Sequence, residues 1–440
     1  MTYLLYNIIF TCFLVFAAPY FLVRALIDGR FRRALIQRMG FLPSPSMKGP
    51  IWVHAASVGE VFCTIPLLKR IKKEFTHCEI VLTTMTSTGN EAAKSRVPEA
   101  NRVFFFPFDH PLMLQRAMEK IQPSLVLIAE TELWPNFLHA CGKKRVPVVL
   151  FNGRISEKSY RRYRLLKSFF KKCLQSISLF LMQAEGDRLR IVQIGATPER
   201  TRVTGNLKFD QSFSPVAQEA LTRMSESFRL GEREAILIAG STRPGEEEIL
   251  LNLFRDLRES IPHLVLILAP RHLERLDEVE RILKREFLPW IRRTSLQDDR
   301  KGRDRPPVIL LDTMGELMGL YSLGTVVFIG GSLVPLGGHN PLEPLFFKKC
   351  TLFGPYMFHF SEISSRLVEA GGAIQVENGE ALAVQLKRLL LDEEARNQVG
   401  EKGYQFLQRH QGATEKTFEE IKPFLAELRI SDCGMRNRKA

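Results

Sequence analysis

Two series of short, uniformly apolar runs, separated by amphipathic stretches, constrain the fold of this chain more than any other feature. The first series comprises residues 51–55, 80–84, 103–106, 125–129, 148–151 and 180–183, and the second comprises residues 236–239, 264–269, 308–311, 326–329 and 351–353. Runs that are apolar at every position are typical of strands buried on both faces of a parallel sheet. Their alternation with helical patterns predicts two doubly wound α/β domains.

The domain boundaries follow from the place where this pattern weakens, a mostly polar stretch between residues 209 and 233. We predict an N-terminal domain over residues 25–210, a linker over 211–233, a C-terminal domain over 234–430 and a short basic tail over 431–440. Two such domains facing each other leave a cleft, and ligands of doubly wound sheets bind outside the carboxyl ends of the strands.

The N-terminal segment is apolar and is followed by positive charge. Residues 3–23 carry no charged side chain. The basic residues that follow are Arg24, Arg30, Arg32, Arg33 and Arg38. At ~1.5 Å per residue the segment makes a helix of about 30 Å, enough to cross a bilayer. The positive-inside rule then predicts a membrane anchor over residues 1–24 and a cytoplasmic location for the rest. A buried helix of a soluble domain stays an alternative, and Asn7 and Pro19 also allow a helix that lies in one leaflet.

Charge and cysteine content narrow the class of partner. The chain has 440 residues, with 62 Lys and Arg against 48 Asp and Glu, so its net charge is +14. This favours an acidic partner such as nucleic acid, an anionic membrane or a phosphorylated substrate. The seven cysteines include no C-x-x-C pair, which argues against structural zinc and against a disulfide framework.

Carboxylates follow two strands of the first half. Ser57 and Glu60 have the spacing of a capping box directly after the first predicted strand. Glu60 is therefore either a helix cap or a general base at a strand end, and the pattern alone does not decide. Glu130 and Glu132 follow another strand, as solvated loop residues or as part of a site. Trp134 beside them is either a packing residue or a platform for a sugar or acyl chain.

A basic run at residues 154–172 holds eight Lys and Arg residues against Glu157 alone. Its interleaved aromatic residues are Tyr160, Tyr163, Phe169 and Phe170. A solvated helix face is one explanation. Contact with lipid phosphates and acyl chains is another, and with a membrane anchor nearby it is favoured over nucleic acid.

The second half places polar and glycine-rich segments after its strands. Arg271 follows one strand, and glycines 330 and 331 and then 337 and 338 lead to Asn340 and Pro341, which predict a helix N-cap and first helical position. Such turns present backbone N–H groups to an anion, which suits a nucleotide phosphate. Glu343 is placed either to bind ribose hydroxyls or to complete the cap.

Several known chemistries are not supported by the sequence. It contains no Walker A motif, no G-x-G-x-x-G after the first strand, no Asp-x-Asp and no H-E-x-x-H. We therefore expect no metal, and phosphate charge would be met by Lys, Arg and helix ends. Lys208 is a candidate for this role.

Taken together, these motifs resemble one family closely, the membrane-associated 3-deoxy-D-manno-oct-2-ulosonic acid (Kdo) transferases of Gram-negative bacteria. The matching segments are WVHAASVGE at 52–60, AETELWPN at 129–136, NGRISEKSY at 152–160, GNLKFD at 205–210, PRH at 270–272, DTMGEL at 312–317 and GGHNPLEP at 337–344. The resemblance spans about residues 20–420. It implies a glycosyltransferase-B fold of two Rossmann-like domains, and transfer of Kdo from CMP-Kdo to a lipid A precursor, lipid IVA, in lipopolysaccharide biosynthesis. It implies no cofactor, no nucleic acid partner and a bacterial inner-membrane location.

The resemblance also implies roles for individual positions. Glu60 is expected to be the general base, and Glu130 and Lys208 are expected to stabilise the transition state. The expected CMP-Kdo contacts are Pro270, Arg271, Met314, Gly315, Glu316, Asn340, Pro341, Leu342 and Glu343. Two alternatives stay open: a related enzyme that moves a UDP-linked sugar onto a membrane lipid, and a non-catalytic nucleotide or lipid binder.

Overall fold

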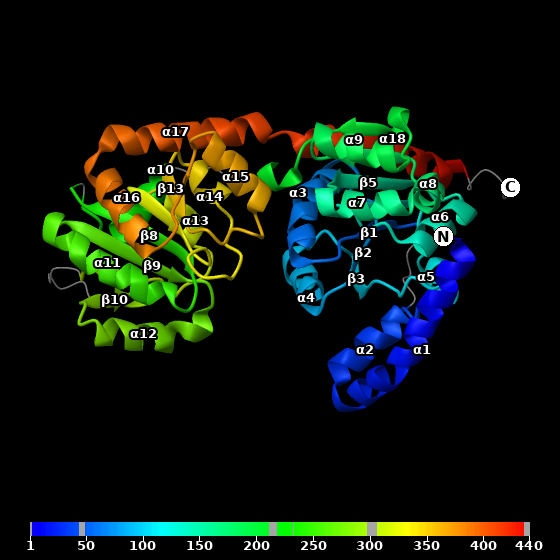
Figure 1. Ribbon diagram of the computed structural model, residues 1–440, viewed down its shortest axis with the longest axis horizontal. Coiled ribbons are helices and arrows are strands. Elements are labelled where there is room, and N and C mark those ends of the chain that lie inside the picture. The colour runs from blue at the N-terminus through cyan, green and yellow to red at the C-terminus, as the bar shows by residue number, and fades with distance from the viewer. Residues whose placement is uncertain (1, 44–48, 211–217, 232, 297–305, 435–440) are drawn as a thin grey trace. The chain divides into compact units, whose positions relative to one another are not determined.

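The computed structural model describes residues 2–43, 49–210, 218–231, 233–296 and 306–434. The chain divides into two compact units, each taken here by itself. Unit 1 consists of Met1–Ser212 together with His410–Ala440, and unit 2 consists of Phe213–Arg409. Figure 1 labels the elements of both units.

Unit 1 is built on a parallel sheet of seven strands in the order β3-β2-β1-β4-β5-β6-β7 (Figure 1). The strands are β1 Ile51–His54, β2 Ile80–Thr84, β3 Arg102–Phe105, β4 Leu125–Ala129, β5 Val148–Gly153, β6 Leu179–Met182 and β7 Thr201–Val203. Its helices after the N-terminal pair are α3 Val58–Glu74, α4 Ser87–Arg96, α5 Pro111–Ile121, α6 Pro135–Lys144, α7 Glu157–Leu165, α8 Lys167–Leu174 and α9 Glu185–Ile194, with short turns η1 Pro198–Arg200 and η2 Leu207–Asp210.

The uniformly apolar runs are explained by two cores, one on each face of the sheet. In β1, Trp52 belongs to one core, whereas Ile51 and Val53 belong to the other. Alternate residues of a strand point to opposite faces, so helices on both faces require every position to be apolar. The six strands predicted for this half are confirmed, and β7 at the sheet edge was not predicted.

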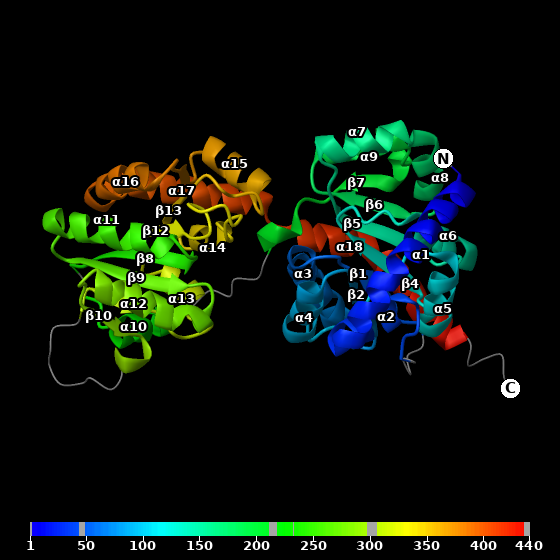
Figure 2. The same ribbon diagram turned by 60° about the horizontal axis from the view of Figure 1, so that its bottom comes forward.

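Unit 2 repeats this architecture with the strand order β10-β11-β9-β8-β12-β13-β14 (Figure 2). The strands are β8 Ala235–Thr242, β9 Leu264–Pro270, β10 Trp290–Arg292, β11 Val308–Leu310, β12 Val326–Ile329, β13 Cys350–Phe353 and β14 Ile374–Gln375. The helices are α10 Gln218–Ser227, α11 Glu246–Ser260, α12 Leu276–Arg285, α13 Leu317–Tyr321, α14 Leu342–Leu345, α15 Ser361–Glu369, α16 Gly379–Leu391 and α17 Glu393–His410, with turns η3 Leu273–Arg275 and η4 Thr294–Leu296. All five strands predicted for this half are present, and the short β10 and β14 were not predicted.

Two predicted boundaries are wrong. The expected linker, 211–233, contains helix α10 of unit 2. The expected second domain extends only to Arg409, because helix α18 (Ala413–Gly434) packs on α3 of unit 1 (Figure 2). Phe418 of this helix is fully buried in the unit 1 core, and Arg70 makes a bidentate ion pair with Glu415 at 2.8 and 2.9 Å. An amphipathic pattern predicts a helix but does not specify which core the helix covers.

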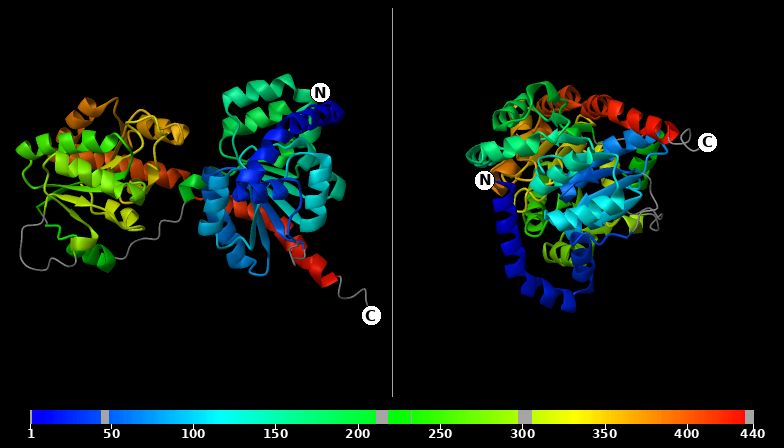
Figure 3. Two further views of the ribbon diagram at one scale, coloured as in Figure 1. Left: turned by 90° about the horizontal axis from the view of Figure 1, so that it is seen from below. Right: turned by 90° about the vertical axis from the view of Figure 1, so that its right-hand side faces the viewer.

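The N-terminal segment forms α1 (Tyr3–Ile27) and then α2 (Gly29–Arg38), an angled pair at the edge of unit 1 (Figure 3). The predicted helix over 3–23 is confirmed and extends four residues further. Within the part of the chain that the structure describes, α1 is the one helix long and apolar enough to cross a membrane, with a mean hydropathy of 2.0 over its best window.

Candidate active site

Both sheets place polar side chains where the strand order reverses. In unit 1 the central neighbours are β1 and β4, and in unit 2 they are β8 and β12. The carboxyl ends of such strand pairs are the ligand-binding edge of doubly wound sheets. The predicted residues Glu60 and Glu130 follow β1 and β4, whereas the glycine-rich turn at 330–331 follows β12.

Glu60 lies in the first turn of α3 and forms the predicted capping box. The hydroxyl of Ser57 accepts the N–H of Glu60 at 3.4 Å and donates to Oε1 of Glu60 at 2.9 Å. The backbone N–H of Ala56 donates to Oε2 at 2.8 Å. Both carboxylate oxygens therefore have partners, and the side chain is fixed at the end of β1.

The environment of Glu60 also makes it an unusual acid. Its side chain is only 9% exposed. The pKa of Glu60 is raised to about 7. Burial is the largest cause, the nearby carboxylates of Glu130 and Glu132 also raise the pKa, and the hydrogen bonds from Ala56 and Ser57 lower it by less. A carboxyl group that titrates near neutral pH can accept and release a proton there. The cap and the perturbed acid are thus the same side chain.

Glu130 and Lys208 form an ion pair beside this carboxylate. Nζ of Lys208 lies 3.1 Å from Oε1 of Glu130, and both side chains are partly buried. Glu130 has a φ of +55°, a left-handed conformation that costs about 1 kcal/mol for a non-glycine residue. The buried thiol of Cys63 lies close enough to interact electrostatically with all three groups. Burial is the largest cause of its raised pKa; Glu130 and Glu60 raise the pKa further, and Lys208 lowers it. The structure therefore brings together the three residues predicted to be catalytic.

Asn152, which is not among the predicted site residues, holds the backbone that carries Lys208. It is the penultimate residue of β5, has a φ of +51° and is fully buried. Its Oδ1 accepts the N–H of Leu207 at 2.9 Å, and its carbonyl accepts Nε2 of Gln183 at 3.0 Å. Its position directly after the apolar run 148–151 could have identified it, because polar side chains at the carboxyl ends of strands lie at the ligand-binding edge of a doubly wound sheet.

Glu132 and Trp134 have mainly structural partners. The indole N–H of Trp134 donates to Oε2 of Glu132 at 2.8 Å, and Nε2 of His54 lies 3.8 Å from the same oxygen. Burial raises the pKa of Glu132, but the nearby His54 ring and the hydrogen bond from Trp134 lower it by more, so the net pKa is lowered. Trp134 packs against Phe106 with ring centroids 6.1 Å apart. Of the two interpretations of Trp134, the structure favours packing.

The basic run forms α7 and α8. Its aromatic side chains face the core of unit 1, whereas basic side chains of the run are exposed. Phe169 is buried, and Tyr160, Tyr163 and Phe170 pack against the core of unit 1. Phe169 is therefore part of the core, whereas Tyr160, Tyr163 and Phe170 are partly exposed, and contact of these three rings with lipid stays a prediction. Basic side chains of α7, such as Arg161, remain exposed.

In unit 2, the predicted donor residues lie on three segments that follow strands. Pro270 ends β9, and the backbone N–H of Arg271 donates to the carbonyl of Thr242 at 3.0 Å. Met314 is 61% exposed beside Gly315, which has a φ of +90°. The carboxylate of Glu316 is occupied by Arg293 at 3.1 Å and by the hydroxyl of Thr313.

The segment at 340–343 differs by one residue from its prediction. Helix α14 begins at Leu342, so Pro341 is the cap instead of the first helical residue. Oδ1 of Asn340 still accepts the N–H of Leu342 at 3.1 Å, and its Nδ2 donates to Glu343 at 3.3 Å. Burial raises the pKa of Glu343 to about 7, opposed by the Asn340 hydrogen bond and by Arg271.

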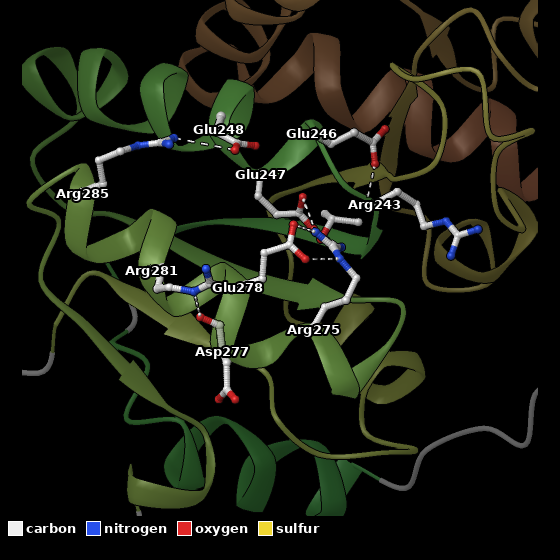
Figure 4. A network of polar contacts seen from close by, with 10 residues as sticks. Arg243, Glu246, Glu247, Glu248, Arg275, Asp277, Glu278, Arg281 and Arg285 are labelled. Carbon is white, nitrogen blue, oxygen red and sulfur yellow. Dashed lines mark hydrogen bonds and ion pairs between the residues drawn. The ribbon is translucent and has the colours of Figure 1, made fainter.

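The glycine-rich turn after β12 binds the side-chain carboxylate of Glu246. Glu246 at the start of α11 is fully buried, and its carboxylate accepts the backbone N–H groups of Gly331 (2.6 Å), Ser332 (2.9 Å) and Leu333 (2.9 Å). It also accepts the N–H of Arg243 at 3.0 Å (Figure 4). The prediction that the N–H groups of this turn are free for a phosphate is therefore wrong, because a carboxylate already uses them.

Cationic side chains gather around this turn instead. Burial lowers the pKa of His339 to about 3, and Arg271, Arg243, His359 and His272 lower it further. Nε of Arg243 is buried without a hydrogen-bond partner among the described residues, and Figure 4 shows its guanidinium pointing away from Glu246. A buried, unpaired guanidinium N–H beside other positive groups suits an anionic ligand. Arg243 was missed, although it follows the strand at 236–239.

Two doubly wound parallel sheets with these polar strand ends define a glycosyltransferase-B fold. A UDP-GlcNAc 2-epimerase from Neisseria meningitidis, solved with UDP-GlcNAc bound, is similar in fold with a TM-score of 0.54 and 12% identity over 86% of this chain and all of that chain. Residues 33–211 match the family described as 3-deoxy-D-manno-octulosonic-acid transferase (kdotransferase).

Two full-length relatives identify the family. The 3-deoxy-D-manno-octulosonic acid transferase of Haemophilus influenzae is 37% identical over 90% of this chain and 92% of its own length. The transferase of the same name from Chlamydophila psittaci is 31% identical over 97% of this chain and 98% of its own. The chain belongs to the Kdo transferase family.

Proposed function

We propose that this protein transfers Kdo from CMP-Kdo to the lipid A precursor lipid IVA, with inversion at the anomeric carbon and CMP as the leaving group. Membership in the Kdo transferase family supports the transferred sugar. The observation that carries the mechanism is the buried carboxyl group of Glu60, whose pKa lies at about 7 next to Glu130 and Lys208.

In this proposal Glu60 removes the proton of the attacking hydroxyl of the acceptor. Its Oε2 and Oε1 are held by Ala56 and Ser57, so the base is oriented before substrate arrives. A base whose pKa lies near the working pH combines ionisation with driving force for proton transfer. Glu130 stabilises the positive charge that develops at the anomeric carbon, and Lys208 offsets the negative charge of the site.

Unit 2 is proposed to bind the donor through the predicted segments. The proposed contacts are Pro270, Arg271, Met314, Gly315, Glu316, Asn340, Pro341, Leu342 and Glu343. For Glu316 the available group is the backbone, because its carboxylate is bound to Arg293. We add Arg243 to this set. Because Glu246 occupies the turn after β12, the single phosphate of CMP-Kdo is met by guanidinium groups instead of by that turn.

We also propose that α1 attaches the protein to the inner membrane of a bacterium with both units on the cytoplasmic side. The apolar α1 and the arginines that follow it support this location. Attachment holds the acceptor-binding unit near an insoluble lipid, so that only the donor has to diffuse to the enzyme.

The reaction is tested by incubating purified protein with CMP-Kdo and tetra-acylated lipid A precursor and weighing the products by mass spectrometry. A lipid that gains Kdo supports the proposal. Release of CMP and free Kdo without a glycolipid product contradicts it.

The donor is tested by thermal protection, since a ligand that binds only the folded state raises the melting temperature. CMP should protect, and UMP should not. Arg271→Ala should remove the protection, whereas Arg281→Ala, an exposed arginine of α12, should keep it. Stronger protection by UMP would favour an enzyme that uses a UDP-linked sugar.

A further inference from the structure

One side of α1 is less exposed than the other. The less exposed residues recur every three or four positions, and include Tyr3, Tyr6, Phe10, Leu14, Phe21 and Ala25. Such spacing places them on one face of the helix. A lone helix surrounded by lipid has no reason for such a face, whereas a helix lying along a protein surface does.

The first turns of α1 are bonded to the interior of unit 1. The hydroxyl of Tyr6 donates to Oδ2 of Asp109 at 2.8 Å, and Nδ2 of Asn136 donates to Oδ1 of Asn7 at 2.7 Å. The ring of Tyr3 meets Phe169 of α8 edge-on, with centroids 5.3 Å apart. Asp109 and Asn136 are themselves buried, and Asp109 accepts the N–H groups of the first turn of α6.

The second half of α1 contacts the same unit through Phe21. The ring of Phe21 stacks on Phe108 with centroids 5.9 Å apart, next to the aspartate that holds Tyr6. After α1, Oε1 of Gln37 accepts the N–H of Phe105 at 2.9 Å, and Arg38 donates to the carbonyl of Met85. Phe21 of α1 and residues 37–38 of α2 therefore contact the same folded unit as Tyr6, whereas the last residues of α1, including Leu26 and Ile27, are exposed.

This arrangement does not fit a helix that crosses the membrane. A helix of 25 residues is about 37 Å long, and the hydrocarbon core of a bilayer is about 30 Å thick. If Arg24 stayed on the cytoplasmic side, Tyr3 and Tyr6 would reach the far side. Their partners Asp109 and Phe169 belong to a unit that folds on the near side.

The outward face of α1 is apolar and has positive charge near both ends. Its exposed residues include Leu4, Ile8, Val15, Phe16, Leu22 and Leu26, with Phe16 84% and Leu26 82% exposed. Exposed Arg24, Arg30, Arg32 and Arg33 follow at one end, and α7 and α8, with their exposed basic side chains, adjoin the other through Phe169. This charge complements anionic headgroups, to which each Lys or Arg contributes about 1 kcal/mol of attraction.

We propose that α1 lies in the plane of one leaflet, with its outer face among the acyl chains and both of its ends on the cytoplasmic side. The inference rests on the proposed membrane location but replaces a crossing anchor with an in-plane one. It gives unit 1 a fixed orientation at the bilayer surface, because the helix is hydrogen-bonded to that unit at Tyr6 and Asn7 and packs on it at Phe21.

Sidedness is tested with single cysteines and a membrane-impermeant maleimide in spheroplasts. The background has Cys12 and Cys433 replaced by Ser, since the other cysteines are buried. Thr2→Cys marks the start of α1, and Lys387→Cys on an exposed position of α16 marks the side of unit 2. We expect both to be protected in intact spheroplasts and both to be labelled after lysis. Labelling of Thr2→Cys alone in intact spheroplasts overturns the proposal, as does labelling of Thr2→Cys only after detergent is added.

The occupant of the outer face is tested by flotation of purified protein with vesicles of phosphatidylcholine and phosphatidylglycerol. Phe16→Glu combined with Leu26→Glu should abolish flotation. The matched control Leu391→Glu, 62% exposed in unit 2, should keep it. If the double variant still floats with the vesicles, the proposal is overturned. It is also overturned if the wild-type protein is a dimer that the double variant, but not the control, dissociates. Kdo transfer to detergent-dispersed acceptor, measured in parallel, separates the two proposals, because its failure alone rejects the enzymatic function and leaves the in-plane helix standing.

Discussion

Replacing Glu60 with Gln separates its role as a base from its role as a cap. A Gln side chain keeps an oxygen for the N–H of Ala56 and a second polar atom for Ser57, so the start of α3 should be preserved. It cannot accept a proton from an alcohol. We expect turnover to fall about 10²–10⁴-fold, the usual contribution of a general base, while CMP protection stays unchanged.

The same substitution should stabilise the protein, but only at high pH. The folded pKa of Glu60 is raised from 4.5 to about 7 by burial. Stability from this group is therefore fully present below pH 4.5 and is lost as the pH rises through 7, a difference of about 3 kcal/mol. Glu60→Gln removes the loss, so the melting temperature of unit 1 at pH 8 should rise by about 6–12 °C, with little change at pH 5.

The assays are initial rates of Kdo transfer and thermal melts at both pH values. The wild-type rate at low substrate concentration should increase with pH through about 7, as Glu60 ionises. Glu91→Gln on exposed α4 is the control and should change neither readout. Unchanged turnover in Glu60→Gln would refute the base, and an equal gain in melting temperature at both pH values would refute burial as the cause of the raised pKa.

Two further predictions concern Lys208 and α18. Lys208→Met leaves Glu130 without its ion-pair partner at 3.1 Å, so turnover should fall about 10²–10³-fold at unchanged CMP protection; a loss of both would place Lys208 in donor binding. Ending the chain after Arg409 removes Phe418, Ile421 and Leu425, all fully buried, and their burial at about 1.5–3 kcal/mol each approaches the stability of a whole domain. The truncated protein should lose the cooperative melting transition of unit 1 in calorimetry, and a transition at the wild-type temperature would show that α18 is dispensable.

The strands were predictable because a strand that is buried on both faces of a sheet is apolar at every position. The sequence predicts all the long strands, whereas β7 and β10 escape because three-residue strands such as Thr201–Val203 and Trp290–Arg292 include Arg202 and Arg292 at the sheet edges. The capping box was predictable for a similar reason, since Ser57 and Glu60 interact over three residues.

Features that depend on distant segments were not predictable from local pattern. The pKa of Glu60 is raised first by burial and then by Glu130, and these two residues become neighbours only because β4 pairs with β1. The hydrogen bonds from the turn after β12 to the carboxylate of Glu246 join residues that are 85–87 positions apart in the sequence. In the sequence, Glu246 begins an acidic triplet that looks like a solvated helix start, and nothing nearby indicates that its carboxylate is buried.

The two strand-reversal points show how one fold can carry opposite charge. In unit 1, Glu60 and Glu130 gather at the strand ends with Lys208 as counter-charge, which favours proton transfer. In unit 2 the equivalent acid, Glu246, is sequestered by four backbone N–H groups, so the surroundings of Arg243 stay cationic. A free carboxylate there would repel a phosphate, whereas a sequestered one fixes the turn without exposing its charge. In the proposed function, the division into a proton-accepting unit and an anion-binding unit follows from which carboxylates each sheet leaves accessible, and a glycosyl transfer with a phosphate leaving group needs both.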